Sequence, residues 1–209
     1  MVSVLMAVFN TPFELVKRAI DSVLNQDYQN FELIIIDDGS QLKLSQQLLN
    51  YCYLYQNKLT YIRHQNIGQA HTINMGVNYC NGAYITIIDS DDEYKTNHLS
   101  TCMAEMQFAD LTSSLTETIV NHTDDYYVPD KNNFNKNIHV DDCILFATLF
   151  GKKEVFKNTS FKNQYSADSQ FYEDAALNYQ VKKLTNRTYI YYRNSSQSIT
   201  AQLKLAQVK

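Results

Sequence analysis

The stretch that decides the fold is Phe31-Glu32-Leu33-Ile34-Ile35-Ile36-Asp37-Asp38-Gly39-Ser40. Residues 31–36 are apolar except for Glu32, which is typical of a strand buried on both faces of a parallel sheet. The strand stops at two aspartates followed by Gly39 and Ser40, and all three residue types form turns. A buried strand that ends in a polar turn indicates an α/β protein whose ligand site lies beyond the carboxyl end of the strand.

The same pattern recurs on both sides of this stretch. Three further buried strands are predicted over residues 2–8, 59–63 and 83–88. Apolar residues at helical spacing predict helices between the strands, over residues 12–24, 42–56, 70–80 and 95–108. Strand–helix repetition with short links predicts right-handed βαβ units and a Rossmann-like, mostly parallel central sheet flanked by helices.

The second half of the chain is less regular. We expect strands over residues 111–120, 144–150 and 188–192, a helix over 172–184, and a polar loop over 121–138. No internal repeat is visible, and 209 residues suit one domain. The expected organisation is therefore a single domain over residues 1–209.

The composition excludes several functional classes. Hydrophobic residues make up 44% of the chain, enough for a single sizeable core, and the net charge of −4 offers no basic face for nucleic acid. No apolar stretch approaches the roughly 20 residues that span a bilayer, and no signal peptide opens the chain. The four cysteines are too widely spaced for a zinc site, which fits free thiols in a reducing cytosol. We expect a cytoplasmic protein with no nucleic-acid partner.

An acidic cluster, Asp89-Ser90-Asp91-Asp92, follows the strand predicted over residues 83–88. Alternate residues of an extended segment point the same way, so Asp89 and Asp91 can reach one ligand together. Carboxylates suit Mg²⁺ or Mn²⁺, and such a cation neutralises the charge of a departing diphosphate. The alternative is that Asp91 or Asp92 caps the following helix. Capping explains one of the three aspartates, so we favour the ligand site.

For each of three other polar motifs, the sequence allows two interpretations. Asp37-Asp38 can accept hydrogen bonds from a base or a ribose, or can simply form a turn. Asn66-Ile67-Gly68 and Asn74-Met75-Gly76 fit either turn and packing chemistry or close approach of the backbone to a ligand. Glu173-Asp174 either interacts with a helix dipole or supplies a general base.

Taken in order, these clusters resemble the family 2 glycosyltransferases, which are inverting enzymes of the A-type glycosyltransferase fold. The resemblance is carried by residues 2–10, 19–28, 31–40, Asn66/Gly68 with Asn74/Gly76, 82–92, Glu173-Asp174, and Tyr192-Arg193 with Ser198-Ile199-Thr200. It covers most of the chain, and a joint match in the correct order is more specific than any single piece.

The resemblance implies a role for each site residue. Asp174 would be the catalytic base, and Asp91 would bind a divalent cation, Mn²⁺ or Mg²⁺. Donor-binding residues would be Ala7, Val8, Asn10, Asp37, Asp38, Asn66, Gly68, Asp89 and Ser90. Residues that contact the acceptor or support the site would be Asp92, Glu173 and Arg193.

The implied activity is inverting transfer from a nucleotide-diphosphate sugar, commonly a UDP-sugar, to a hydroxyl of a glycan or lipid-linked acceptor. The family context implies surface polysaccharide synthesis and peripheral association with the inner face of the cell membrane. Residues 1–110 would bind the donor and residues 111–209 the acceptor. Leu42 stands where the family commonly has Asp, which would weaken capping of the second helix. Ile73 stands where the family commonly has Arg, which removes a charge near the donor and leaves donor preference open.

Two competing functions are weaker. A nucleotidyltransferase would carry a Gly-rich, basic phosphate loop after the first strand, whereas residues 9–13 contain neither Gly nor Lys. A non-catalytic domain that binds a partner transferase would be indicated by loss of the metal or base carboxylates. Both are present, so an active transferase is the favoured prediction.

Overall fold

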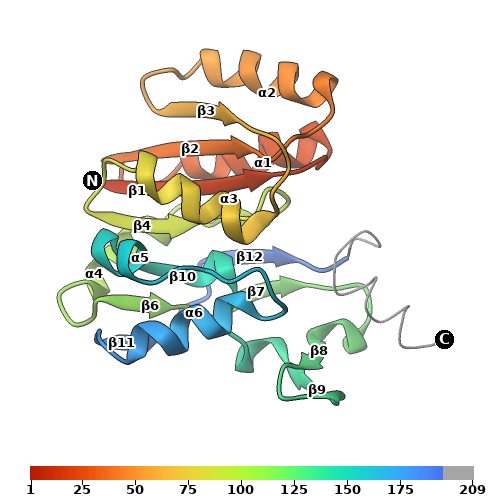
Figure 1. Ribbon diagram of the computed structural model, residues 1–209, viewed down its shortest axis with the longest axis vertical. Coiled ribbons are helices and arrows are strands. Elements are labelled where there is room, and N and C mark those ends of the chain that lie inside the picture. The colour runs from red at the N-terminus through yellow and green to blue at the C-terminus, as the bar shows by residue number, and fades with distance from the viewer. Residues whose placement is uncertain (195–209) are drawn as a thin grey trace.

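A computed structural model describes residues 1–194, which form a central sheet with helices on both faces (Figure 1). The Ser198-Ile199-Thr200 part of the C-terminal motif lies outside the described residues. The central sheet has seven strands in the order β11-β6-β10-β4-β1-β2-β3. A three-stranded sheet, β5-β12-β7, and a two-stranded hairpin, β8-β9, complete the strands.

The central strands are β1 (Val2–Val8), β2 (Phe31–Asp37), β3 (Leu59–Arg63), β4 (Tyr84–Ile87), β6 (Leu111–Ser113), β10 (Leu149–Lys152) and β11 (Val181–Lys183). The smaller sheets use β5 (Glu93–Tyr94), β7 (Thr116–Ile119), β8 (Tyr127–Asp130), β9 (Asn133–His139) and β12 (Tyr189–Tyr192). The helices are α1 (Phe13–Leu24), α2 (Leu42–Tyr53), α3 (Gln69–Gly76), α4 (His98–Glu105), α5 (Lys153–Asn158) and α6 (Ala167–Ala176). Short 3₁₀ helices are η1 (Val77–Tyr79), η2 (Thr123–Tyr126), η3 (Val140–Asp142) and η4 (Phe146–Thr148).

Strands β1 to β4 are mutually parallel, and β10 runs antiparallel to both β4 and β6. Val8 at the end of β1 pairs with Asp37 at the end of β2. The carboxyl ends of these strands therefore meet at one edge of the sheet. The predicted α/β class, with a mostly parallel central sheet flanked by helices, is confirmed.

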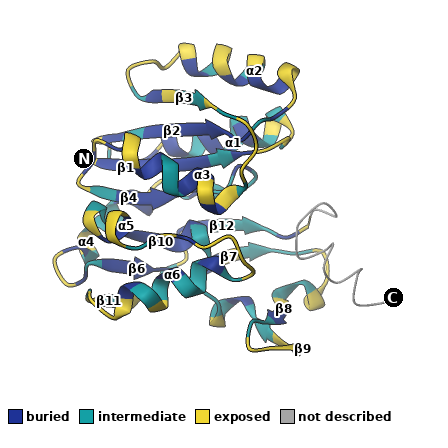
Figure 2. Ribbon diagram, in the orientation of Figure 1, coloured by how far each residue is buried: buried dark blue, intermediate teal, exposed yellow. Residues whose placement is uncertain are grey.

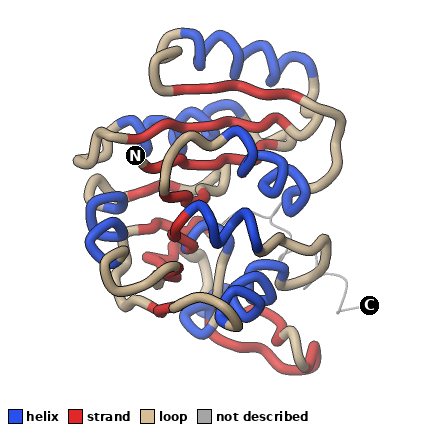
Figure 3. Tube along the Cα trace, turned by 60° about the vertical axis from the view of Figure 1, so that its left-hand side comes forward, coloured by secondary structure: helices blue, strands red, loops and turns tan. Residues whose placement is uncertain are grey.

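Helices lie on both faces of the central sheet (Figure 3). Apolar side chains of α1, α2 and α4 pack with one face of β1 and β2, and those of α3, α5 and α6 pack with the other. As a result β1, β2 and β4 are buried almost throughout (Figure 2). A rigid, doubly covered sheet is a stable base from which strand-end side chains can be positioned.

The second half differs from the expectation in four places. The strand predicted over 144–150 is the 3₁₀ helix η4 followed by β10, which extends to Lys152. Residues 111–120 form two strands, β6 and β7, which belong to different sheets. Residues 121–138 are not a loop, because they contain η2, β8 and most of β9. The predicted helix over 172–184 begins earlier, at Ala167, and ends at Ala176, before β11. These elements are short, so their apolar patterns are too brief to set their bounds.

Among residues 1–194, no helix is both long enough and apolar enough to cross a membrane.

Candidate active site

The loops after β1 and β2 are tied to each other at the edge of the sheet. Asn10 adopts a left-handed backbone, with φ of 55°, and its N–H donates to Ser40 Oγ at 3.0 Å. The Asn10 side-chain oxygen accepts from the Gln41 N–H at 2.9 Å. Ala7 and Val8 lie just before this junction, Val8 buried and Ala7 half-buried. The predicted donor residues at the ends of these two strands are therefore brought together.

Asp37 is fully buried, and its carboxylate is saturated with protein partners. It accepts hydrogen bonds from Ser45 Oγ at 2.5 Å, Tyr61 OH at 2.6 Å and Ser40 N at 2.7 Å, with Arg63 Nε at 3.6 Å. Burial alone would raise the pKa of Asp37, but the hydrogen bonds outweigh it and hold the pKa below its usual range. In this structure Asp37 fixes the end of β2 to α2 and β3.

Asp38 fixes the loop that precedes α3. Its carboxylate accepts from Ile67 N at 2.7 Å, Gly68 N at 3.0 Å and Asn66 Nδ2 at 3.1 Å. A Cβ on Gly39, whose φ is +80°, would lie 2.7 Å from Asn66 N, so only glycine allows this close approach. Asn66 and Gly68 are thus held beside Asp38 at the predicted nucleotide pocket.

The loop after β4 carries the acidic cluster toward α3 and α6. Asp89 is half-buried and accepts from Gln69 Nε2, in the first turn of α3, at 2.8 Å. Burial, together with the negative charges of Asp91 and Asp168, raises the pKa of Asp89 to about 7. Ser90 Oγ lies 2.7 Å from Thr11 Oγ1, which joins this loop to the one after β1.

Asp92 and Asp91 have different surroundings. Asp92 is 1% exposed and accepts from Tyr189 OH at 2.6 Å and Tyr192 N at 2.8 Å, so it anchors the loop to β12. Among residues 1–194, no other side chain donates a hydrogen bond to the Asp91 carboxylate, whose pKa is raised by burial. Neither residue caps α4, because that helix begins at His98 after Asn97. Asp92 therefore holds the loop in place. The Asp91 carboxylate is left available for a ligand.

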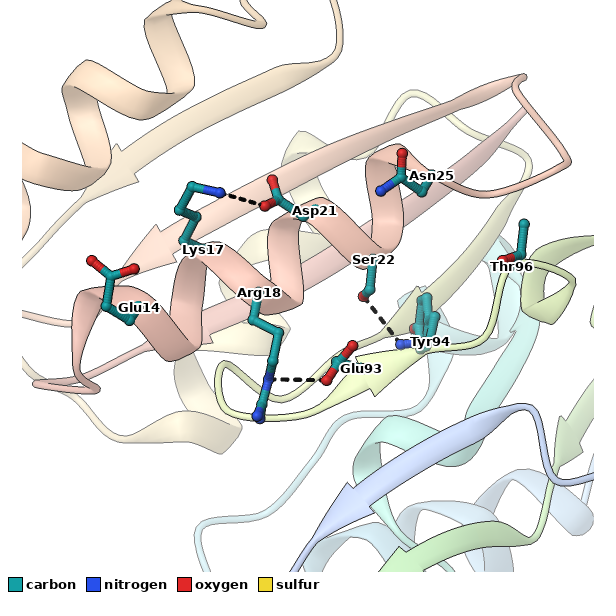
Figure 4. Close-up of a pocket in the computed structure, with 9 residues that line it drawn as sticks. All are labelled: Glu14, Lys17, Arg18, Asp21, Ser22, Asn25, Glu93, Tyr94 and Thr96. Atoms are coloured by element: carbon teal, nitrogen blue, oxygen red, sulfur yellow. Dashed lines mark hydrogen bonds and ion pairs between the residues drawn. The ribbon is translucent and has the colours of Figure 1, made fainter.

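Helix α1 contacts the segment that follows the acidic cluster, where Arg18 points toward Glu93 (Figure 4). Arg18 donates to the Asp91 carbonyl oxygen, pairs with Glu93 at 3.1 Å, and lies 3.9 Å from the centre of the Tyr192 ring. A polar cavity of 390 Å³ opens between α1 and β5, lined by charges of both signs. Asp89, Asp91 and Asp168 do not line it, so this cavity is separate from the acidic cluster.

The residues predicted to act as base and support lie on the outer side of α6. Asp174 pairs with Lys162 at 3.0 Å and accepts from Gln170 Nε2 at 2.8 Å, and these hydrogen bonds lower its pKa. Glu173 is exposed and pairs with Lys131 at 2.5 Å. Both carboxylates are engaged with lysines, and neither is brought to Asp89 or Asp91 by any described contact.

Asp168, in the first turn of α6, was not singled out from the sequence. It is half-buried, and burial raises its pKa to about 6. After burial and the charge of Asp91, the charge of Asp168 also raises the pKa of Asp89, so the two carboxylates are close enough to interact electrostatically. The apolar series Ala167, Phe171 and Ala175 is the signal that could have found it, since helical spacing from Ala175 places the helix start at 167.

Arg193 follows β12, and its charge acts on the same groups as that of Asp168. It is 8% exposed, and its NH1 lies 3.5 Å from Tyr191 OH, with no described partner for Nε among residues 1–194. Its positive charge lowers the pKa values of Cys143 and Tyr165, whereas the charge of Asp168 raises both. A buried guanidinium with an unsatisfied N–H close to an acidic cluster can receive an anionic ligand.

Comparison of the sequence with known protein families assigns the chain to one of them. The sequence profile of "Glycosyl transferase family 2" matches residues 3–141. The chain belongs to glycosyl transferase family 2. A relative is the putative colanic acid biosynthesis glycosyl transferase WcaA of Escherichia coli (strain K12), 40% identical over 109 residues. That match covers 51% of this chain and 38% of WcaA, so the chain spans well under half the length of this relative.

Two solved structures share the fold of this family 2 chain. TarS of S. aureus in complex with UDP-GlcNAc gives a TM-score of 0.73 at 19% identity, over 96% of this chain and 60% of that chain. The mannosyltransferase PcManGT of Pyrobaculum calidifontis, in complex with GDP-Man and Mn²⁺, gives 0.74 at 15% identity, over 99% and 60%. At these identities the likeness bears on the fold alone, and it confirms the expected A-type glycosyltransferase fold.

The acidic cluster of this family 2 chain suits a cation that is shared with a ligand. No group of three or more His, Cys, Asp or Glu side chains in residues 1–194 could hold a metal ion by itself. Asp89 and Asp91 nevertheless place two mutually repelling carboxylates at the end of β4. Mg²⁺ is usually bound by one or two carboxylates plus substrate phosphates and water. The residues present therefore fit a divalent ion that binds together with a diphosphate.

Proposed function

We propose that this protein is an inverting glycosyltransferase that moves a sugar from a nucleotide-diphosphate sugar to a hydroxyl of a glycan or lipid-linked acceptor. The observation that carries the proposal is the Asp89/Asp91 pair at the end of β4, with the half-buried Asp168 of α6 near enough for its charge to raise the pKa of Asp89. Inverting transfer needs a cation site for the leaving diphosphate and a separate carboxylate for the nucleophile. On this fold of the glycosyltransferase class, Asp89 and Asp91 would serve the first role and Asp168 the second.

On the donor side, Asp91 and Asp89 would hold Mn²⁺ or Mg²⁺. The cation would neutralise the negative charge of the departing nucleotide diphosphate. Arg193 would add a second positive charge, because its unsatisfied Nε–H can donate to a phosphate oxygen. Ala7, Val8 and Asn10 would border the nucleotide, with Asp38 holding Asn66 and Gly68 in place beside it.

On the acceptor side, we assign the catalytic base to Asp168 in preference to Asp174. Asp168 would take the proton of the acceptor hydroxyl, whose oxygen attacks the anomeric carbon as the bond to the diphosphate breaks. Its pKa of about 6 suits a general base near neutral pH, whereas the pKa of Asp174 is lowered by its pairing with Lys162 and Gln170. A lowered pKa and an ion pair make Asp174 the weaker base.

The donor class and the biological context rest on relatives. TarS binds UDP-GlcNAc and PcManGT binds GDP-Man, so a nucleotide sugar is the expected donor and a UDP-sugar the first to test. The name of WcaA supports a role in polysaccharide synthesis. Residues 1–110 would form the donor half and residues 111–209 the acceptor half of one domain. A cytoplasmic location, with a lipid-linked acceptor at the membrane face, stays a prediction of the family resemblance.

The assignment of the base is tested by comparing Asp168→Asn with Asp174→Asn. Release of nucleoside diphosphate from a panel of UDP- and GDP-sugars would be measured with Mn²⁺, together with binding of the same nucleotides. Loss of a general base typically lowers turnover by about 10²- to 10⁴-fold. We expect that loss for Asp168→Asn, with nucleotide binding retained, and a change of less than about threefold for Asp174→Asn. The reverse order would return the role to Asp174.

A further inference from the structure

Two exposed aromatic rings meet beside the start of α6. Phe134, on β9, is 52% exposed, and Tyr165, in the loop before α6, is 36% exposed. Their ring centroids are 5.1 Å apart with an interplanar angle of 46°. Tyr165 OH donates to the Pro129 carbonyl oxygen of β8 at 2.7 Å, so the second ring is fixed to the same hairpin. The pair is thus a preformed surface rather than two independent side chains.

The aromatic pair lies next to the proposed base. Tyr165 precedes Asp168 by three residues, and its pKa is raised by burial and by the charges of Cys143 and Asp168. The positive charge of Arg193 also reaches Tyr165. Hairpin β8–β9 lies below α6, at the end of the molecule opposite α2 and β3 (Figure 1). A molecule resting on the two rings would therefore lie on the acceptor side of the site.

The hairpin that carries Phe134 has neutral amides and balanced charges. Three exposed asparagines lie on β9: Asn133, Asn135 and Asn137. Lys131 of the turn is paired with Glu173 of α6, and the other charged side chains of β8 and β9, Asp130 and Lys136, are opposite in sign. Amides donate to and accept from hydroxyls, and an aromatic face packs against the apolar C–H face of a sugar ring. Such a surface suits a neutral carbohydrate better than a strongly charged molecule.

We propose that Phe134 and Tyr165 form a sugar-binding platform that holds a neutral glycan acceptor with one hydroxyl directed at Asp168. This inference rests on the proposed function and names the acceptor class of that site. The proposal also gives Glu173 a role, since the Lys131–Glu173 pair holds the hairpin turn against the helix that carries Asp168. Glu173 would then be a positioning residue, consistent with its place among the predicted supporting residues.

The absence of tryptophan from the chain allows a direct test. Phe134→Trp would place a single indole on the platform, and Tyr53→Trp would place one on α2, where Tyr53 is 71% exposed. Both variants would be titrated with methyl β-glycosides and β-linked disaccharides of glucose, galactose, mannose and N-acetylglucosamine, and the emission followed. We expect a saturable change in the emission of Phe134→Trp with at least one sugar, and no change in that of Tyr53→Trp.

Further variants separate ring stacking from other causes. In the Phe134→Trp background, Tyr165→Phe keeps the ring but loses the hydrogen bond to Pro129, so it should weaken sugar binding less than about threefold. Tyr165→Ala removes the ring and should weaken sugar binding at least about tenfold, which corresponds to about 1.4 kcal/mol. Equal emission responses from the platform indole and the α2 indole, or equal effects of the two Tyr165 variants, would contradict the platform.

Binding of UDP and GDP with Mn²⁺ would be measured on the same Phe134→Trp protein. Nucleotide binding together with a platform indole that responds to none of the sugars would overturn the platform and leave the donor site standing. A sugar response without nucleotide binding would support the platform while removing the proposed transferase function. The two failures are thereby distinguishable.

Discussion

Asp168 and Asp174 stand six residues apart on α6, and their surroundings shift their pKa values in opposite directions. Burial disfavours the charged form of Asp168, whereas hydrogen bonds from Lys162 and Gln170 favour the charged form of Asp174. Opposite shifts on one helix place the acid limb of the pH profile at different pH values for the two bases, and this makes the choice of base measurable without a variant.

We predict that kcat/KM for sugar transfer rises with pH through about 6 and is flat above it, because only the ionised Asp168 can accept a proton. Below that point log(kcat/KM) should fall by about one for each pH unit. The profile would be measured at saturating Mn²⁺, so that protonation of the strand-end carboxylates does not limit the rate. A profile that stays flat well below the ordinary carboxyl pKa would indicate Asp174.

The sequence located the polar residues at the strand ends but not the function of each carboxylate. Asp37 and Asp38 were correctly placed at a strand end, where both a ligand contact and a turn were open. Whether each aspartate contacts a ligand or holds a turn depends on hydrogen-bond donors far along the chain, such as Tyr61 for Asp37 and Ile67 for Asp38. The spacing of residues around an aspartate carries no information about such distant hydrogen-bond donors.

At the scale of elements, the side chain of Asn74 forms hydrogen bonds that connect α3 to the loop before α6. Asn74 donates from Nδ2 to the Phe161 carbonyl oxygen at 2.7 Å and accepts from the Phe161 N–H at 2.9 Å. The Phe161 ring stacks on Phe171 of α6 at 4.1 Å. This chain of contacts connects the donor side, where Asp38 holds the loop before α3, to the helix that carries Asp168.

We predict that Asn74→Ala lowers stability by about 1–3 kcal/mol, because two backbone groups of Phe161 lose their partner. Turnover should fall more than nucleotide affinity does, since the variant frees the loop before α6 while Asp38 still holds residues 66–68. Thermal unfolding, calorimetric nucleotide titration and kcat would be compared. An equal loss in nucleotide affinity and kcat would refute a role specific to α6.

The elements of the first half were predictable because each follows a local apolar pattern, although α3 and α4 are shorter than predicted and end at Gly76 and Glu105. Strand β3 has the predicted bounds, and β1, β2 and β4 fall on the predicted apolar runs. The hairpin β8–β9 was predicted as a loop, since Asn133, Asn135 and Asn137 give β9 an exposed, polar surface with no buried face to reveal it. The break between β6 and β7 is likewise decided by tertiary pairing with β10 and β12.

At the scale of the whole molecule, a buried histidine connects the three-stranded sheet β5-β12-β7 to helix α4. His98, on α4, is 1% exposed, stacks on Tyr94 of β5 at 3.9 Å and lies 2.8 Å from Thr188 Oγ1 just before β12. Burial lowers the pKa of His98 to about 3. The folded protein therefore keeps this imidazole neutral over the range in which an unfolded chain protonates it.

We predict that His98 makes the protein acid-sensitive. Its folded pKa lies below the unfolded value of about 6.5, so as pH falls from about 6.5 toward 3 the unfolded state gains a proton that the folded state excludes. The free energy of unfolding should fall by about 1.4 kcal/mol per pH unit from this group. Denaturant unfolding of His98→Gln, compared with His71→Gln on the exposed side of α3, should show a flatter acid limb for His98→Gln alone.

The central claim is that Asp91 binds a cation together with the diphosphate of a nucleotide. The most direct measurement is calorimetric titration of the full chain with UDP and GDP, with and without Mn²⁺, on wild type and Asp91→Ala. The account predicts binding of one nucleotide that requires both Mn²⁺ and Asp91. Absence of nucleotide binding by the folded wild-type protein would contradict the donor site and favour a non-catalytic domain that binds a partner transferase.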